Sequence, residues 1–360
     1  MLGLVLAGGH GSRLRPLTRS VLKQLLPIGN KPIITYGIDQ LISAGIEDIG
    51  IVCQEDKREA IDKVLELYYG FKLGSWAKAR FTYLFQEEPL GLAHAVLISQ
   101  KFLGDELFIM YLGDNLLLSP INEFVSKFRG ADATASILLK EVANPEVFGV
   151  ATLDENGSLI DLEEKPKLPK SNLALVGVYA FSSKIFDAVY AIQPSKRGEL
   201  EITDAIKLLL QQGFPIQYGK LEGEWLDTGK KDDLLSANRI VLDQYCVRND
   251  LNSRFGTGIL GRVEVGKGCR IEGSRILGPV RIADRTELID CNIGPYTSIG
   301  SDCVIASASI SESLIMDGSQ ILGVDKMISR SVIGENCVVK GNDDQFINLT
   351  LGSDSVVEVC

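Results

Sequence analysis

The stretch LVLAGGHGSRLRP, residues 4–16, joins a short apolar run to a glycine-rich segment that carries two arginines. The run GLVLA predicts a buried strand, because it is continuously apolar and ends at glycines. The three glycines that follow let the main chain approach a ligand closely, and the guanidinium of Arg13 matches the oxygens of phosphate groups. The stretch therefore predicts a strand of an α/β sheet, followed by either a phosphate-binding loop or an ordinary turn.

Two common phosphate-binding motifs do not fit this loop. The fingerprint GxGxxG needs a third glycine, but residues 9–14 read GHGSRL, and Pro16 opposes an immediate helix. The Walker string GxxxxGK[ST] does not occur in the chain. A glycine-rich segment after a strand can also be an ordinary turn, so its interpretation depends on the motifs that follow.

Composition narrows the classes of function. The chain has 360 residues, 45% of them hydrophobic, and a net charge of −10, which argues against nucleic acid as a partner. No apolar run approaches the roughly 20 residues of a membrane span, and nothing at the N-terminus resembles a signal peptide. The seven cysteines contain no CxxC pair, so we expect reduced thiols in a cytoplasm rather than disulfides or a zinc site.

The first two thirds alternate between apolar strands and amphipathic helices, which predicts an α/β domain with a mostly parallel sheet. Strands are expected at residues 49–53, 80–86, 106–115 and 174–181, and a helix at residues 57–69. The string LGDN places Asp114 at the carboxyl end of a buried strand, where a metal ligand or a turn-capping carboxylate is expected. The string WLDTG presents a second isolated carboxylate, Asp227.

Three more strings combine charged side chains with turns or close packing. LEEKP puts Glu164 and Lys165 side by side before a proline, and RGELEITD carries Arg197 in a loop before a helix. Gly177 interrupts the strand ALVGVYAF, which predicts close approach of another group. Each string also has a plain structural interpretation, as a solvated ion pair or a surface charge, and for Trp225 core packing is favoured.

Together with KQLLP (23–27) and NKP (30–32), the opening loop forms the pattern GGxGxRLxPLT…KxxxP…KP. In this pattern the chain resembles the sugar nucleotidyltransferases, which join a nucleoside triphosphate to a sugar 1-phosphate. LGDN, LEEKP, RGELEITD and WLDTG, in this order, resemble the glucose-1-phosphate thymidylyltransferases among them, over residues 1 to about 245. The resemblance implies a Rossmann-like nucleotidyltransferase domain that uses Mg²⁺, dTTP and glucose 1-phosphate and releases pyrophosphate.

The resemblance also implies roles for single residues. Arg13, assisted by Lys23, would be catalytic and bind the outgoing phosphates, while Asp114 and Asp227 would hold Mg²⁺. The residues implied to bind the nucleotide are Leu6, Gly8, Gly9, Gly11, Ser12, Gln86, Pro89, Gly91 and Asp114. Those implied to bind the sugar phosphate are Gly149, Glu164, Lys165, Val176, Arg197 and Trp225.

Some substrate alternatives stay open at this point. Thymine and uracil differ by one methyl group, worth only about 1–3 kcal/mol in an apolar pocket, so UTP is the alternative to dTTP. N-acetylglucosamine 1-phosphate or galactose 1-phosphate could replace glucose 1-phosphate, since Val176 stands where the short bacterial enzymes usually carry Thr. His10 and Ser12 also depart from the residues most often seen in the loop.

From Val265 onward the chain repeats every 17 residues. Three columns of aliphatic residues or Met follow this period: Val265, Ile282, Ile299, Met316 and Ile333; Ile271, Leu288, Ile305, Leu322 and Val339; Ile276, Ile293, Ile310 and Met327. The repeat predicts a left-handed parallel β-helix of 17–18-residue coils over residues 246–360, after a catalytic domain over residues 1–245. Cysteines recur on the same lattice with polar residues between them, and we interpret all five as core-facing: Cys269, Thr286, Cys303, Gln320 and Cys337.

The role of this repeat region is expected to be structural. Many β-helix enzymes are acyltransferases that use a histidine base, but both histidines of this chain, His10 and His94, lie in the first domain. We therefore expect a scaffold for a homo-oligomer, plausibly a trimer, and chemistry that does not need this half directly. A helix at residues 232–246 would connect the domains, and the tail after Gly341 would cap the last coil.

Overall fold

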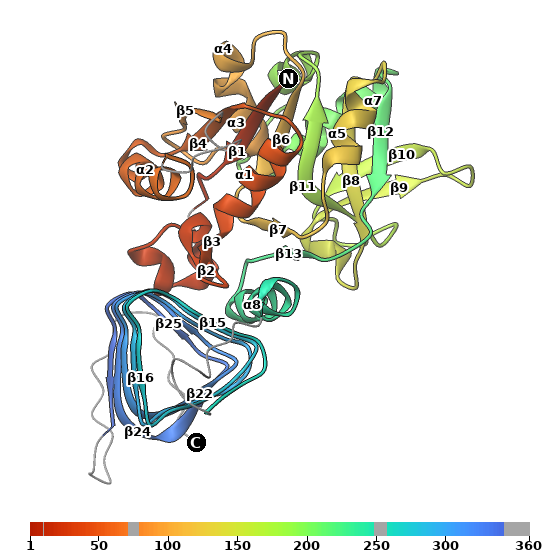
Figure 1. The fold of residues 1–360 in the computed structure, drawn as a ribbon. Helices are drawn as coiled ribbons and strands as arrows, with labels where there is room; N and C mark the ends of the chain where they lie inside the picture. Colours follow the sequence, from red (N-terminus) through yellow and green to blue (C-terminus); the bar gives the residue numbers. More distant parts are fainter. Residues whose placement is uncertain (10, 71–78, 248–257, 342–360) are drawn as a thin grey trace. The chain divides into compact units, whose positions relative to one another are not determined.

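The computed structural model describes residues 1–9, 11–70, 79–247 and 258–341 (Figure 1). The chain forms two compact units, which we call unit 1 (residues 1–10 and 33–227) and unit 2 (residues 11–32 and 228–360). The short segment 11–32 thus belongs to the same unit as the C-terminal repeats, although it directly follows the first strand. These units divide the chain differently from a single boundary at residue 245.

Unit 1 is built on a nine-stranded sheet. Its parallel part has the order β6-β1-β4-β5 and consists of β1 (Leu2–Leu6), β4 (Asp48–Cys53), β5 (Arg80–Phe85) and β6 (Phe108–Leu112). β11 (Leu173–Phe181) pairs antiparallel with β6, so the sheet is mixed. The remaining strands are β8 (Ala135–Glu141), β9 (Gly149–Leu153), β10 (Leu159–Glu164) and β12 (Ile216–Lys220). All five strands expected from the sequence are present, although the strand expected at residues 106–115 is shorter and spans Phe108–Leu112.

Helices pack against both faces of this sheet. Successive side chains of a strand point to opposite faces, so each buried strand has apolar side chains on both sides of the sheet. Leu4 of β1 and Met110 of β6 belong to an apolar core with α3 (Leu92–Ile98), α6 (Ile185–Ala191) and α7 (Ile202–Gln211). Tyr111 points the opposite way and lies against Gly37 of α1 (Ile33–Ser43), where a Cβ atom would come within 2.6 Å of the ring. The other helices of unit 1 are α2 (Arg58–Leu65), with a π-turn Glu66–Gly70 that completes the expected helix, α4 (Gln100–Leu103) and α5 (Asn122–Arg129).

Unit 2 contains a parallel β-helix, whose coils enclose a three-sided core in Figure 1. Its strands are β14 (Ile259–Leu260), β15 (Val263–Val265), β16 (Arg270–Glu272), β17 (Arg275–Leu277), β18 (Val280–Ile282), β19 (Glu287–Ile289), β20 (Asn292–Ile293), β21 (Thr297–Ile299), β22 (Val304–Ser311), β23 (Leu314–Ile315), β24 (Gln320–Ser329), β25 (Val332–Ile333) and β26 (Val338–Lys340). Each strand pairs parallel with its equivalent in the next coil. The fold class predicted from the sequence is confirmed.

The rest of unit 2 consists of α8 and the segment 11–32. α8 (Lys231–Tyr245) matches the helix expected at residues 232–246. The segment contains three short 3₁₀ turns, η1 (Ser12–Leu14), η2 (Leu17–Arg19) and η3 (Lys23–Leu25). It ends in a hairpin of β2 (Pro27–Ile28) and β3 (Lys31–Pro32). The expected cap after Gly341 lies outside the described residues.

The 17-residue register of the β-helix holds for three coils and then shifts. Ile299 pairs with Ile315, one residue earlier than predicted, and Ile315 then pairs with Ile333. A shift of one residue turns a strand side chain to the opposite face. Three predicted column members, Met316, Leu322 and Met327, are therefore wrong, and the aligned residues are Ile315, Ile321 and Ile328. Met327 is 64% exposed, whereas the other predicted column members align.

A column of small polar side chains follows one corner of the coils. Each donates a hydrogen bond to a backbone carbonyl of the next coil: Cys269 to Ala283 (3.0 Å), Thr286 to Gly300 (2.6 Å), Cys303 to Met316 (3.2 Å) and Ser319 to Gly334 (2.7 Å). Ser319 replaces the predicted Gln320, for the same register reason, and Cys337 is exposed rather than core-facing. These bonds satisfy polar groups that would otherwise be costly to bury.

The six cysteines in the described part of the chain are all free thiols. Burial raises the pKa of the Cys303 thiol to about 11, so this thiol stays protonated at neutral pH.

Within the described ranges, no helix combines the length and the apolar character that crossing a membrane requires.

We predict that Ile305→Ala destabilises the β-helix by about 2–5 kcal/mol, because Ile305 is fully buried between Leu288 and Ile321. Denaturant unfolding followed by circular dichroism measures the change. Leu277→Ala is the control, since Leu277 is 52% exposed and its truncation leaves no buried cavity. Equal losses of stability in the two variants would contradict the assigned core.

Candidate active site

The loops after the parallel strands of unit 1 meet at one edge of the sheet. Gly113 N donates a hydrogen bond to Leu6 O at 2.9 Å, which extends the pairing of β1 and β6 beyond the strands themselves. The segments that begin at Gly8 and at Asp114 therefore leave the sheet as neighbours. This carboxyl edge is where open α/β sheets bind ligands.

Gln86 occupies this edge at the end of β5. Its side chain is buried, and its Nε2 lies 3.3 Å from Gly91 O and 2.8 Å from His94 Nδ1. Burial lowers the pKa of His94, partly opposed by the charge of Glu88, so the ring is neutral at pH 7 and its Nδ1 can accept from Gln86. A Cβ atom on Gly8 would lie 3.2 Å from Gln86 Oε1. Gly8, Gln86 and Gly91 thus lie together around an amide that can donate and accept hydrogen bonds.

Gly91 also connects this edge to the loop that carries Arg197. Leu200 N donates to Leu90 O at 2.7 Å, and Ala93 N donates to Leu200 O at 3.0 Å. Gly91 lies between them with φ of 106°, and a Cβ atom there would come within 2.7 Å of Leu200 N and even closer to Leu200 O. Only glycine fits this position, and the fit places the Arg197 loop beside the Gln86 segment.

Asp114 and Asp227 are brought close by a pair of short strands. β7 (Asn115–Leu117) and β13 (Trp225–Asp227) run antiparallel, with Asp227 opposite Asn115. Asn115 Nδ2 donates to Asp114 Oδ1 at 3.2 Å, and Asn115 Oδ1 accepts from Trp225 Nε1 at 2.6 Å. A Cβ atom on Gly177 would lie 2.9 Å from Asn115 Cγ, so Asn115 is the group whose close approach the glycine in β11 permits.

This pair of carboxylates fits a magnesium ion. Mg²⁺ usually binds one or two protein carboxylates and completes its shell with water and substrate phosphates. No three His, Cys, Asp or Glu side chains in the described ranges gather into a closed cage. Asp114 and Asp227 are half-buried oxygen donors of the kind that this open coordination needs.

Glu164, at the end of β10, is the centre of a second cluster. Its Oε2 accepts a hydrogen bond from Thr203 Oγ1 at 2.7 Å, and its Oε1 lies 3.4 Å from Lys165 Nζ and 3.8 Å from Arg197 Nη2. A Cβ atom on Gly149 would lie 3.1 Å from Glu164 Oε2. The cluster therefore combines two cations, which attract an anion, with a carboxylate that can accept hydroxyl hydrogen bonds.

Arg197 is held in this cluster by acidic neighbours. Its Nε and Nη2 donate to the Glu201 carboxylate at 3.0–3.1 Å, and its Nη2 also donates to Glu199 at 3.0 Å. Burial alone would lower the pKa of Arg197, but the hydrogen bonds and charge of Glu201, with the charges of Glu199 and Glu164, raise it. The guanidinium is therefore both charged and oriented. Ser195 Oγ supports Glu201 with a hydrogen bond of 2.7 Å.

Arg13 and Lys23 lie in unit 2 on one compact loop. Gly11 has a φ of 56° and begins the turn η1, in which Leu14 N donates to Gly11 O at 2.9 Å. Thr18 Oγ1 donates to the same carbonyl at 2.7 Å. A Cβ atom on Gly11 would lie 3.0 Å from Lys23 Cβ, so the loop rests on a buried lysine while Arg13 is exposed. His10 lies outside the described residues.

The remaining predicted site residues differ in exposure. Pro89 and Gly9 are exposed in loops, whereas Val176 is fully buried within β11. Trp225 is 8% exposed and its ring lies 4.9 Å from that of Phe148, which agrees with the core interpretation. The sequence motifs indicate no functional role for Asn115, Thr203 or Glu201. Asn115 could have been found because it directly follows Asp114, and Glu201 and Thr203 because they lie within RGELEITD.

The strand ends of this α/β sheet carry a pair of carboxylates and a cluster of cations. This arrangement is typical of enzymes that act on phosphorylated substrates. The family described as nucleotidyl transferase matches residues 2–244, and the chain belongs to this family. The class of enzyme predicted from the sequence is thereby confirmed.

Individual relatives agree with this assignment. A glucose-1-phosphate thymidylyltransferase of Streptomyces antibioticus is 45% identical over 365 residues, covering 100% of this chain and 99% of that protein. The low-salt glycan biosynthesis nucleotidyltransferase Agl11 of Haloferax volcanii is 39% identical, covering 100% of both chains. Among solved structures, UDP-glucose pyrophosphorylase complexed with UDP-glucose is 28% identical, with a TM-score of 0.60 over 68% of this chain and 100% of that chain.

We predict that Gly91→Ala lowers nucleotidyl transfer at least about tenfold, because the added methyl displaces Leu200 and with it the Arg197 loop. The initial rate of pyrophosphate release measures the effect. Gly213→Ala is the control: its φ is also positive, at 82°, but nothing lies within 4 Å of the added atom. A wild-type rate for Gly91→Ala would show that this contact does not position the site.

Proposed function

We propose that this protein transfers a thymidylyl group from dTTP to α-D-glucose 1-phosphate, giving dTDP-glucose and pyrophosphate. The observation that carries the proposal is the backbone pairing of Leu200 with Leu90 and Ala93, which joins the Gln86 segment to the Arg197 cluster. The amide of Gln86 can form hydrogen bonds with a nucleotide base, and the cluster around Arg197 can bind an anion. Because these groups lie on adjoining segments, a nucleotide and a sugar phosphate could bind side by side. The full-length similarity to an enzyme with this name supports the same substrates.

The reaction forms one bond and breaks one. An oxygen of the sugar phosphate attacks the α-phosphorus of the triphosphate, and the bond to the β-phosphate oxygen breaks, so that pyrophosphate takes the electron pair. Catalysis of this kind depends on positioning and electrostatics rather than on acid–base groups. A chain with only two histidines is compatible with that demand.

Each predicted residue has a role in this scheme. Arg13 would be paired with the departing β- and γ-phosphates, assisted by Lys23. Asp114 and Asp227 would hold Mg²⁺, which supplies positive charge to the phosphate oxygens when it is bound. The nucleotide would contact backbone and side-chain atoms of Leu6, Gly8, Gly9, Gly11, Ser12, Gln86, Pro89 and Gly91.

The sugar phosphate would occupy the Glu164 cluster. Lys165 and Arg197 would bind its phosphate, and Glu164 would accept hydrogen bonds from sugar hydroxyls beside Gly149. Val176 and Trp225 would form the apolar boundary of this pocket. In this assignment all the reacting groups come from residues 1–245.

We also propose that the protein forms a homo-oligomer through the β-helix, with a trimer as the expected state, and that it is located in the cytoplasm. The regular stacked coils offer flat faces for self-association. Five of the six free cysteines in the described part of the chain are buried, and free thiols are typical of a reducing compartment.

The substrates are tested by a grid of dTTP, UTP, ATP and GTP against the 1-phosphates of glucose, galactose, mannose and N-acetylglucosamine, with pyrophosphate release as readout. We expect the highest kcat/KM for dTTP with glucose 1-phosphate. A UTP preference over dTTP would replace the proposal with uridylyl transfer, and an optimum with another sugar phosphate would replace the acceptor.

We predict that Asp227→Asn lowers kcat at least about 100-fold, because an uncharged amide is a poor ligand for Mg²⁺. The rate is measured across a titration of MgCl₂. Asp154→Asn is the control, because this carboxylate accepts hydrogen bonds from Asn156 N and Ser158 N in the turn between β9 and β10. Turnover near the wild-type value at saturating Mg²⁺ would remove Asp227 from the metal site.

A further inference from the structure

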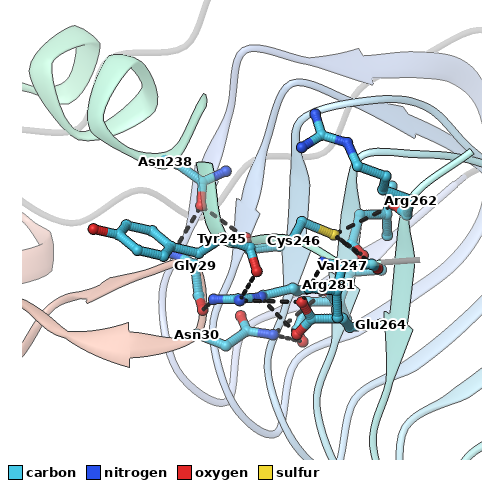
Figure 2. Close-up of polar contacts among 12 residues, drawn as sticks. Gly29, Asn30, Asn238, Tyr245, Cys246, Val247, Arg262, Glu264 and Arg281 are labelled. Atoms are coloured by element: carbon cyan, nitrogen blue, oxygen red, sulfur yellow. Dashed lines mark hydrogen bonds and ion pairs between the residues drawn. The ribbon is translucent and has the colours of Figure 1, made fainter. Parts of the chain in front are cut away.

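The tip of the β2–β3 hairpin lies against the β-helix within unit 2 (Figure 2). The two-residue turn consists of Gly29 and Asn30, whose φ angles of 56° and 61° are those of a type I′ turn. Asn30 Nδ2 donates to Ile299 O at 2.8 Å and approaches Arg281 O at 3.4 Å. The side-chain amide of the turn thus binds backbone carbonyls of two neighbouring coils.

Arg281 of β18 holds the same turn from the other side. Its Nη1 donates to Gly29 O at 3.1 Å, and its Nη2 donates to Tyr245 O, at the end of α8, at 2.9 Å. Glu264 in the preceding coil accepts from Arg281 Nε at 2.9 Å and Nη2 at 3.1 Å. The Arg281 and Glu264 side chains are 19% and 26% exposed, so water screens this ion pair less than a surface pair.

Asn238 of α8 completes the enclosure of the turn. It is 1% exposed, and its Oδ1 accepts from Gly29 N at 2.9 Å and from Ser298 Oγ at 2.7 Å. Its Nδ2 donates to Tyr296 O at 3.0 Å. A Cβ atom on Gly29 would lie 2.6 Å from Val241 Cγ1, so helix and coil contact the turn closely.

Buried contacts lead from this hairpin to the phosphate-binding loop. β2 directly follows Leu26, which is fully buried and whose N donates to Lys23 O at 3.1 Å in the turn η3. Lys23 in turn contacts Gly11, because a Cβ atom there would lie 3.0 Å away from Lys23 Cβ. A displacement of the hairpin would therefore move Lys23 and the loop that carries Arg13.

We propose that the β-helix positions the phosphate-binding loop of this enzyme through Asn30, Arg281 and Asn238. The inference rests on the proposed function, which assigns the triphosphate to Arg13 and Lys23. The segment 11–32 has only 3₁₀ turns and a two-residue hairpin of its own, and such short elements need external contacts to hold one geometry. Misplacement of a catalytic group by about 1 Å can cost about 100-fold in rate, so this anchoring matters for turnover.

With these contacts, the C-terminal half contributes to catalysis indirectly. All predicted catalytic residues precede residue 230, and this position in the sequence predicts that the first half can react without the second. The groups that hold the segment 11–32 come from α8 and from the coils between Glu264 and Ile299. The β-helix is then part of the catalytic apparatus, although the proposed function assigns none of its described residues to a substrate.

The test uses the full-length variants Asn30→Gly and Arg281→Met. Glycine retains the left-handed turn and removes the amide, and methionine retains the aliphatic stem and removes the guanidinium. We expect kcat/KM for the nucleoside triphosphate to fall about tenfold or more in each variant, while KM for the sugar 1-phosphate stays unchanged. Backbone amides of residues 11–28 should exchange faster with deuterium, and those of β1 should not.

Arg285→Met is the matched control. Arg285 forms an equivalent ion pair with Asp302 in the next coil, with both N–O distances 2.6 Å. Among the described residues, neither side chain of this exposed pair has a hydrogen bond or ion pair with the segment 11–32. We expect its kinetics and the deuterium exchange of residues 11–28 to match those of the wild type.

Four outcomes separate the possibilities. A fall in kcat/KM for the triphosphate with an unchanged KM for the sugar 1-phosphate in Asn30→Gly and Arg281→Met, with melting temperatures close to that of Arg285→Met, supports the proposal. Wild-type kinetics in both variants overturn it, as does a rise in the KM of both substrates that follows a lower melting temperature. Absence of turnover in the wild-type protein with every substrate pair contradicts the proposed function instead, and the deuterium exchange then still decides whether the turn anchors the segment.

Discussion

The pairing of β1 with β4 on one side and β6 on the other determines where the chemistry of this enzyme lies. A central parallel strand cannot shift along its axis without breaking hydrogen bonds in two ladders at once. The glycine-rich loop after β1 and the Asp114 loop after β6 therefore begin at defined and adjacent points. Gln86 reaches the same edge because β5 continues the parallel order beyond β4.

A second parallel arrangement organises unit 2. Stacked coils repeat not only their apolar columns but also their backbone carbonyls, so that the surface of a β-helix carries regularly spaced acceptors. Asn30 uses two of these carbonyls, and the Glu264–Arg281 ion pair exists because both residues occupy equivalent positions one coil apart. The lattice that stabilises the β-helix thus also supplies the anchor for a loop far away in sequence.

The net charge of this protein is negative, but single positive side chains determine the charge at the candidate site. The net charge of −10 opposes the approach of the two proposed substrates, a nucleoside triphosphate and a sugar phosphate, which are both anions. Arg197 stays charged and oriented because acidic neighbours outweigh the effect of its burial on the pKa. Attraction of two polyanions therefore depends on a few well-held cations, and displacing one of them has larger consequences than its contact energy alone.

The sequence by itself determined the elements whose signals are local: the strand and loop at residues 4–16, the motifs around Asp114, Glu164, Arg197 and Asp227, and the repeat from Val265 onward. It also predicted the family. It did not reveal the one-residue register shift at Ile315, because Met316 and Leu322 are apolar as well and fit the strict period. Nor did it reveal that Asn30 meets Ile299, or that Leu200 meets Gly91, since these contacts join residues far apart in the chain. Only packing decides such contacts, because their energy depends on distances between backbones that no local pattern encodes.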